Sequence, residues 1–354
     1  MPAVKSSPRV GVIVAQLGTP DAPTAAALRP YLRQFLSDRR VIDYSPFIWQ
    51  PVLRGVILRT RPRRSARLYH RIWTDEGSPL LKISQRQTEG LQARLGDAYR
   101  VVLGMRYGTP SLNHAMQTLE AEGIDRIVVL PMYPQYSSTT TASIYDGTYM
   151  AAAGTRSAFH DDRKRFIPAL RFVPPYYTHP GYINALRERV LEAVRQHGQP
   201  DRYLFTFHGI PNRYIQTGDP YRAQCEVTAH LLAESLHLQD HQWQVSFQSQ
   251  FGPEKWLQPY TSDTLEGMVH SGAERLLVFA PGFVADCLET LDELGNEGRD
   301  EFVSGGGKAE AYHLAPCLND QPQWLDTMAQ IVQNEALGWV EPVPAAQPAY
   351  EYQR

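Results

Sequence analysis

The sequence has few cysteines, no surplus of either charge and no long hydrophobic run. Three cysteines occur in 354 residues, at Cys225, Cys287 and Cys317. Their odd number and wide spacing exclude a disulfide framework and a zinc site built from paired cysteines. An iron-sulfur cluster normally takes four cysteine thiolates, so we expect none here. A reducing compartment fits this cysteine usage best.

The charges are balanced, with 35 Lys+Arg against 37 Asp+Glu and a net charge of -2. A protein that binds nucleic acid through phosphates needs surplus cations, so we expect no nucleic-acid partner. No apolar stretch approaches the roughly 18 residues of a membrane span. Residues 1–9 also lack the apolar core of a signal peptide. We therefore expect a cytoplasmic protein, with peripheral membrane contact left open.

Six short apolar segments end abruptly in loops rich in glycine and proline. Continuous Val, Ile, Leu and Phe runs that alternate with amphipathic stretches are typical of parallel strands buried on both faces. The predicted strands are Val10–Leu17, Arg100–Arg106, Arg126–Leu130, Tyr203–Phe207, Gln244–Gln248 and Arg275–Ala280. The predicted helices are Ala22–Leu36, Ser84–Leu95, Ser111–Glu122, Pro180–Gln196, Pro220–Leu236, Asp263–Ser271 and Gln323–Glu335.

Three strand-helix units in each half predict two similar α/β domains. We place the N-terminal domain at 8–172, the C-terminal domain at 173–320, a helix that packs back on the body at 321–340, and a disordered Pro/Ala-rich tail at 341–354. Ligands bind outside the carboxyl ends of parallel strands, so the loops after the strands would line one cleft between the domains. We expect a monomer.

His208 directly follows a predicted strand and precedes Gly-Ile-Pro. Its imidazole should therefore project at the carboxyl edge of the sheet, towards the expected cleft. Imidazole can take up a proton near neutral pH or bind a transition metal. A structural role for one of 11 histidines is the alternative of equal weight.

Glu289, Glu293 and Glu297 recur at every fourth residue. On a helix they share one face, with a drift of roughly 40° per step at 3.6 residues per turn. A helix widened towards the π form would align them better. Like charges at this spacing repel, so a row that points into a cleft would favour proton uptake or a cation. A solvated acidic face is the simpler interpretation of this segment alone.

Two further segments have both a functional and a structural interpretation. The hydroxyl-rich loop 133–141, which begins at Tyr133, can bind a polar ligand edge or merely satisfy turns and a helix cap. The apolar stretch 47–58 and the arginines after it form either a core helix with a solvated end, or an amphipathic lip for a membrane or large apolar ligand. The motifs of P-loop NTPases, dinucleotide enzymes and α/β-hydrolases are missing from the sequence.

The chain resembles the ferrochelatase family in a series of motifs that occur in the family's order. The resemblance runs from about Val10 to about Val332. The motifs are Leu17-Gly18-Thr19-Pro20, Gly77-Ser78-Pro79, Arg106-Tyr107, Tyr133-Pro134-Gln135-Tyr136-Ser137, Phe207-His208-Gly209-Ile210-Pro211, the segment Gln248 to Trp256, and Asp286-Cys287-Leu288-Glu289-Thr290-Leu291.

This resemblance implies an enzyme, a lyase that inserts Fe²⁺ into protoporphyrin IX to make protohaem, in a cleft between two Rossmann-like domains. His208 matches the family's histidine and Glu289 its glutamate opposite, the pair assigned to metal binding and proton abstraction. Glu293 and Glu297 match a carboxylate track for protons or metal along a helix with π character. The short N-terminus suggests a bacterial form.

The resemblance also implies where the porphyrin binds. The implied lining residues are Leu17, Ser78, Arg106, Tyr107 and Tyr133, and Arg59 or Arg61 would pair with the propionates. The apolar stretch 47–58 becomes the lip of the pocket and a membrane-facing edge. Some relatives carry histidine where Cys287 stands, so no second imidazole is expected beside the metal.

Two alternatives remain open at this point. One is a chelatase for another metal or tetrapyrrole, and the other is a non-catalytic carrier of haem or metal on the same fold. For the favoured interpretation we expect Fe²⁺ and protoporphyrin IX as substrates and no tightly bound cofactor.

Overall fold

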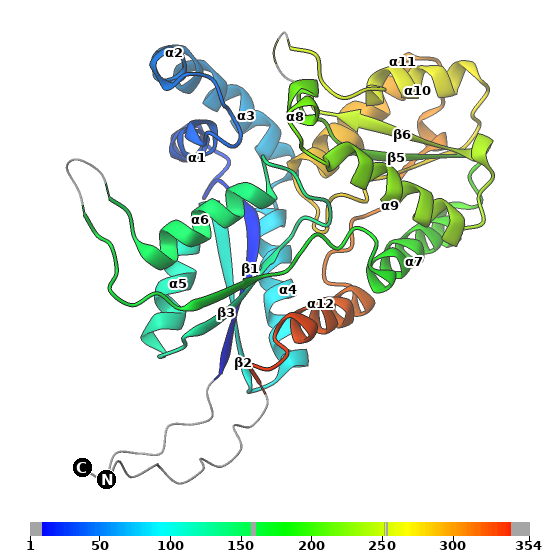
Figure 1. Ribbon diagram of the computed structural model, residues 1–354. Coiled ribbons are helices and arrows are strands. Elements are labelled where there is room, and N and C mark those ends of the chain that lie inside the picture. Colours follow the sequence, from blue (N-terminus) through cyan, green and yellow to red (C-terminus); the bar gives the residue numbers. More distant parts are fainter. Residues whose placement is uncertain (1–8, 157–160, 251, 253, 341–354) are drawn as a thin grey trace, which may run out of the picture.

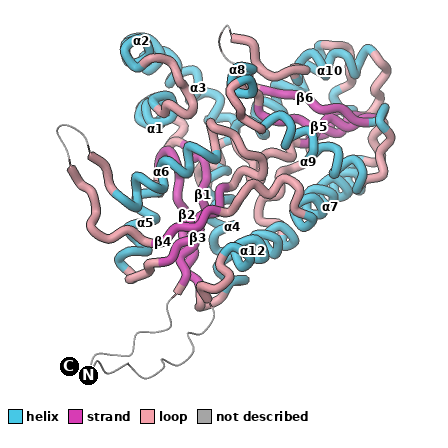
Figure 2. The backbone as a smooth tube through the Cα atoms, in the orientation of Figure 1, coloured by secondary structure: helices cyan, strands magenta, loops and turns pink. Residues whose placement is uncertain are grey.

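The chain folds into two four-stranded parallel sheets, in a computed structural model that describes residues 9–156, 161–250, 252 and 254–340 (Figures 1 and 2). The first sheet has the order β2-β1-β3-β4 and the second the order β6-β5-β7-β8. The strands are β1 (Val10–Thr19), β2 (Tyr99–Gly108), β3 (Arg126–Pro131), β4 (Ala169–Phe172), β5 (Arg202–His208), β6 (Trp243–Gln248), β7 (Leu276–Phe279) and β8 (Tyr312–Leu314). The predicted α/β fold with two parallel sheets is confirmed.

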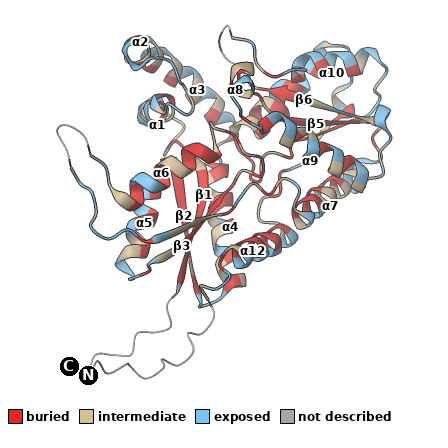
Figure 3. Cartoon of the chain, in the orientation of Figure 1, coloured by how far each residue is buried: buried red, intermediate tan, exposed pale blue. Residues whose placement is uncertain are grey.

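The central strand β1 is buried on both faces, as its continuous apolar sequence predicts. Val12 and Val14 pack into one hydrophobic cluster, whereas Ile13 and Ala15 pack into another on the opposite face. The strand pairs in parallel with β2 on one side and β3 on the other. Figure 3 shows β1 as a buried strand.

Helices flank both sheets, and every predicted helix is present with shifted ends. Helix α4 begins at Pro79, earlier than the predicted Ser84, because Ser78 and Pro79 form a favourable N-terminus. The remaining helices outside the lip are α1 (Ala25–Ser37), α4 (Pro79–Leu95), α5 (Leu112–Ala121), α6 (Thr141–Ala153), α7 (Pro180–His197), α8 (Asn212–Gln216), α9 (Tyr221–Ser235), η2 (Asp240–Gln242), α10 (Thr261–His270), η3 (Glu289–Gly298), α11 (Arg299–Ser304), η4 (Ala309–Ala311) and α12 (Pro322–Glu335).

The apolar stretch after α1 forms a helical arm, which we call the lip. It consists of α2 (Pro46–Val52), the π-helix η1 (Leu53–Ile57) and α3 (Leu58–Ile72), and α3 packs against α1 (Figure 1). Phe47 is 92% exposed and Ile48 is 70% exposed. Within the described residues, no helix combines the length and the apolar character needed to cross a bilayer.

The two halves share one continuous core. The largest hydrophobic cluster joins strands of the first sheet, such as β1, to strands of the second, such as β5. Helix α12 packs against α4 in the first half and against α7 in the second, and Arg94 pairs with Asp326 at 2.5 Å. The predicted tail 341–354 lies outside the described residues.

Candidate active site

A cavity of about 1190 Å³ lies between the two halves of the chain. Its wall includes the ends of strands from both sheets, with Leu17 from β1, His208 from β5 and Gln248 from β6. This is where ligands bind in open parallel sheets. The volume exceeds the roughly 300–1,000 Å³ of most ligand pockets, so the cavity has room for a large ligand.

His208 is the last residue of β5 and lines this cavity. Its Nδ1 lies 2.6 Å from the carbonyl oxygen of Gly209. A carbonyl can only accept, so Nδ1 carries the hydrogen when imidazole is neutral. Nε2 then has a free lone pair that can bind a metal or remove a proton. Trp256 packs near the ring, with 6.3 Å between centroids.

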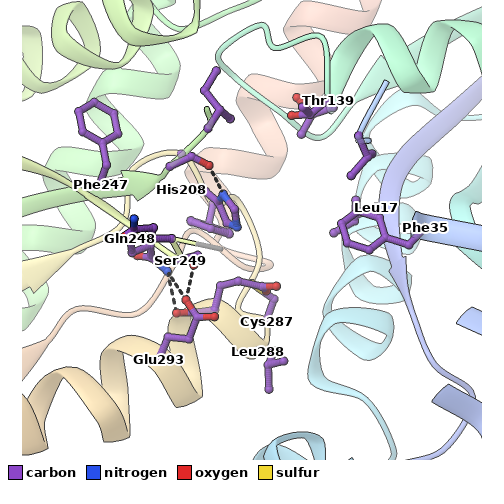
Figure 4. A pocket seen from close by; sticks show the side chains of 18 of the residues that line it. Leu17, Phe35, Thr139, His208, Phe247, Gln248, Ser249, Cys287, Leu288 and Glu293 are labelled. Atoms are coloured by element: carbon purple, nitrogen blue, oxygen red, sulfur yellow. Dashed lines mark hydrogen bonds between the residues drawn. The ribbon is translucent and has the colours of Figure 1, made fainter. Parts of the chain in front are cut away.

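The opposite wall of the cavity is apolar. Figure 4 shows Leu17 and Phe35 facing His208 and Glu293 across the open space. Gly18 follows Leu17 with a φ of +112°, and a Cβ there would lie 1.7 Å from the carbonyl oxygen of Tyr107. Only glycine allows this close approach of β1 to β2, which presents Leu17 at the end of its strand.

Ser78 and Tyr133, two of the predicted porphyrin-binding residues, also line the cavity. Ser78 shares a hydrogen bond of 2.8 Å with Thr19, which joins the start of α4 to the end of β1. The hydroxyl of Tyr133 is buried without a partner, and so is the hydroxyl of Thr140 in the same wall. Burial raises the pKa of Tyr133 well above its usual value, so it remains a neutral donor.

Arg106 and Tyr107 were predicted to line the porphyrin pocket, but they are not among the residues that line the cavity. Both donate to Asp38, at 2.5 Å from Arg106 Nη2 and 2.8 Å from the hydroxyl of Tyr107. Burial alone would raise the pKa of Asp38, but the hydrogen bond from Ser143 and the charge of Arg106 hold it below its usual value. The rings of Tyr107 and Phe35 pack edge to face, with 5.3 Å between their centroids. Tyr107 and Arg106 therefore support the cavity wall from behind.

The predicted row of carboxylates lies on the π-helix η3, and Glu289, Glu293 and Glu297 all line the cavity. Glu289 and Glu293 are half-buried, whereas Glu297 is exposed. The row therefore leads from the cavity interior to solvent. The expectation of a widened helix is confirmed, and the first members of the row are not a purely solvated acidic face.

Side chains from outside the helix donate hydrogen bonds to carbonyl oxygens of η3. Tyr312 donates its hydroxyl to the carbonyl of Leu294 at 2.7 Å, and Gln248 donates its amide to the carbonyl of Glu289 at 3.0 Å. Inserted donors of this kind interrupt a regular helical ladder, and π-segments are frequent at functional sites.

The carboxyl group of Glu293 has a raised pKa. Burial raises its pKa to about 7, the charge of Glu289 adds to this rise, and a hydrogen bond from Ser249 opposes it. Figure 4 shows Ser249 and Gln248 directed at this carboxylate. A carboxyl group with this pKa can change protonation state near neutral pH.

The lip contributes cations to the cavity. Arg61 and Arg64 of α3 line it, whereas Arg59 is exposed and is not in the wall. Burial lowers the pKa of Arg61 and the neighbouring charge of Arg64 lowers it further. A guanidinium nevertheless stays charged in proteins, so both residues can meet an anionic ligand.

Cys287 also lines the cavity, directly before the π-helix. It packs into a small cluster with Leu80 and Ile83, and burial raises the pKa of its thiol well above the usual value. The neutral thiol is a poor metal ligand. No group of three or more His, Cys, Asp or Glu residues within the described ranges is arranged to hold a metal ion.

Several residues of the cavity wall were not predicted from the sequence. These residues of the wall are Tyr31, Phe35, Tyr69, Gln248, Ser249 and Trp256. Gln248, Ser249 and Trp256 belong to a family motif that was identified without roles for its members. Tyr31 and Phe35 stand on a predicted helix, but nothing in the pattern of that helix distinguishes cavity-facing from core-facing aromatics.

The chain is similar to known proteins over most of its length. The family model described as Ferrochelatase matches residues 9–336. A ferrochelatase of Azoarcus sp. (strain BH72) is 48% identical over 341 residues, covering 96% of this chain and 91% of the relative. A ferrochelatase of Edwardsiella ictaluri (strain 93-146) is 48% identical over 322 residues, covering 91% of this chain and 97% of the relative. The solved structure "SirB from Bacillus subtilis with Fe3+" has the same fold, with a TM-score of 0.56 and 12% sequence identity. The match covers 93% of this chain and 96% of that structure's chain.

Proposed function

The chain belongs to the ferrochelatase family, and from this premise we propose which residues of its cleft insert Fe²⁺ into protoporphyrin IX. As a ferrochelatase it is a lyase of haem biosynthesis that makes protohaem and releases two protons. One observation carries the assignment of roles. His208 and the carboxylates of η3 line one cavity that also has an apolar wall and three arginines, Arg61, Arg64 and Arg213.

His208 is the proposed base. A porphyrin must lose two pyrrole N–H protons as the metal enters, and the one free lone pair of a neutral imidazole can accept them in turn if the first proton is passed on before the second is taken up. The carbonyl of Gly209 holds the ring so that Nε2 is the free nitrogen. The same lone pair can contact Fe²⁺, with Glu289 as the second metal contact and catalytic partner.

Glu293 and Glu297 continue the path from Glu289 to the surface. Each proton that leaves the porphyrin needs a sequence of groups that can bind and release it. The pKa of Glu293, about 7, suits such a step. The same row attracts Fe²⁺ when it is ionised, so proton exit and metal entry can use one path in opposite directions.

The macrocycle would bind against the apolar wall formed by Leu17 and Phe35, with Ser78 and the hydroxyl of Tyr133 at its polar edge. Arg61 and Arg64 are the proposed partners of the propionates, since guanidinium groups bind carboxylates in bidentate fashion.

An anaerobic assay tests the assignment against its alternatives. Purified protein is mixed with Fe²⁺ and protoporphyrin IX while porphyrin fluorescence and haem absorbance are followed. We expect fluorescence to fall as haem absorbance rises, faster than with Co²⁺ or with coproporphyrin. Tight haem binding without metal-dependent loss of porphyrin would instead identify a carrier, and faster turnover of another metal or ring would identify a different chelatase.

The exposed tip of the lip is the proposed contact with a membrane surface. Phe47 and Ile48 are 92% and 70% exposed beside a helix rich in arginine, a combination that suits the interface of an anionic bilayer. Replacing both by glutamate should reduce cosedimentation with vesicles containing phosphatidylserine by about tenfold or more. The matched control is Phe166→Glu, at a site that is 62% exposed elsewhere on the chain. Equal vesicle binding by all variants would refute the contact.

We propose further that the enzyme is a cytoplasmic monomer without an iron-sulfur cluster or other tightly bound cofactor. The three cysteines cannot supply the usual four thiolates of a cluster. Visible absorbance of the purified protein and its mass in solution test these two points.

A further inference from the structure

One ion pair joins the lip to the π-helix that carries the carboxylate row. Arg71 Nη1, in the last turn of α3, lies 3.2 Å from Asp292 Oδ1 in η3. The two residues come from different halves of the chain. The Arg71 side chain is 51% exposed, whereas the Asp292 side chain is fully buried.

Asp292 depends on this partner. Its Oδ1 also accepts a hydrogen bond from the Asn296 amide at 2.9 Å, but its Oδ2 is buried with no partner. Arg71 is the cation paired with this buried carboxylate. Removing one member of such a pair leaves an uncompensated buried charge, which is strongly unfavourable.

The position of the pair gives it a role in the site. Asp292 directly precedes Glu293 and, unlike that residue, is not in the cavity wall. The helix of Arg71 also carries Arg61 and Arg64, which are in the wall. The ion pair therefore ties the wall with the cationic side chains to the wall with the carboxylates.

We propose that Arg71 and Asp292 form a positioning pair that holds the carboxylate row of η3 at its working distance from α3. The pair touches neither substrate and acts through Glu289 and Glu293. This inference rests on the proposed role of the carboxylate row. Displacing a reacting group by about 1 Å can cost as much as 100-fold in rate, so a small shift of η3 is sufficient.

The variants R71M, R71K, D292N and R71M/D292N test the proposal in the anaerobic assay. We expect R71M and D292N to lower kcat by about tenfold or more with little change in the KM for porphyrin. R71K keeps the charge and should recover most of the rate. Because both single changes break one interaction, the double variant should be no slower than the slower single variant.

The control pair is Arg86 and Asp320, which also joins the two halves, at 3.1 Å, but is exposed on both sides and lies outside the cavity wall. R86M should leave kcat unchanged. A wild-type kcat in R71M would contradict the proposal. So would a double variant in which the kcat losses of R71M and D292N multiply, because the two residues would then act independently. If R71M fails to fold, R71K is the deciding variant. A kcat of R71K as low as that of D292N would contradict a role based on the charge of Arg71. An inactive wild-type protein would refute the proposed chemistry instead.

Discussion

Replacing His208 by alanine is expected to lower kcat for iron insertion by about 10²–10⁴, the usual contribution of a positioned acid or base. The alanine removes the lone pair that would accept pyrrole protons. Porphyrin binding should persist, because the apolar wall around Leu17 and Phe35 is unchanged. Stopped-flow haem formation and porphyrin fluorescence titration measure the two effects separately.

His241→Ala is the matched control, since His241 is exposed and lies outside the cavity wall. Glu289→Gln, which keeps the shape of the side chain without its charge, should reduce kcat to a similar extent. Full activity in His208→Ala would contradict its role as base. A loss of porphyrin binding in step with kcat would make it a substrate-binding residue instead.

Replacing Glu293 by glutamine is expected to stabilise the protein above pH 7 and to have little effect on stability below about pH 4.5. Burial, reinforced by the charge of Glu289, raises the pKa of Glu293 from 4.5 to about 7 in the folded state. A raised pKa of an acid means that the folded state binds the proton more tightly than the unfolded state. The wild-type protein therefore loses stability as pH rises from 4.5 to 7. The Glu293→Gln variant has no ionisable group at this position, so it does not lose that stability.

The expected difference above pH 7 is on the order of 3 kcal/mol, since one pKa unit corresponds to about 1.4 kcal/mol. Thermal unfolding of both proteins between pH 4 and pH 9 measures it as a gap in Tm that opens through this window. The same variant should be slower in turnover, because glutamine cannot relay a proton. A gap in Tm that is independent of pH would show that Glu293 does not titrate in this window.

The local sequence was sufficient to predict six strands of the two sheets, namely β1, β2, β3, β5, β6 and β7. Strands such as β1 and β5 are continuous apolar runs that end in glycine or proline, and this pattern directly reflects burial on both faces. The two short edge strands β4 and β8 were not predicted. Each has only three or four residues, and Arg171 and His313 interrupt their apolar character, so neither carries a recognisable period.

The candidate site was also only partly predictable from the local sequence. The spacing of Glu289, Glu293 and Glu297 along one helix, and the position of His208 at a strand end, follow from the sequence because both depend on local geometry. The widened helix was a suggestion from spacing alone. Its carbonyls accept hydrogen bonds from Gln248 and Tyr312. These two residues are far from η3 in sequence, so no local pattern could predict the contacts.

By itself the sequence determined the fold class and the family, and it supplied the candidate residues of the site, because strand periodicity and ordered motifs are local properties of the chain. Only the tertiary structure decided which of those side chains face the cavity. It placed Arg106 and Tyr107 behind the wall on Asp38, and brought Arg64 into the wall while Arg59 stayed outside. It also paired Arg71 with Asp292 across 221 positions of sequence, since burial and charge compensation depend on the packing of both halves.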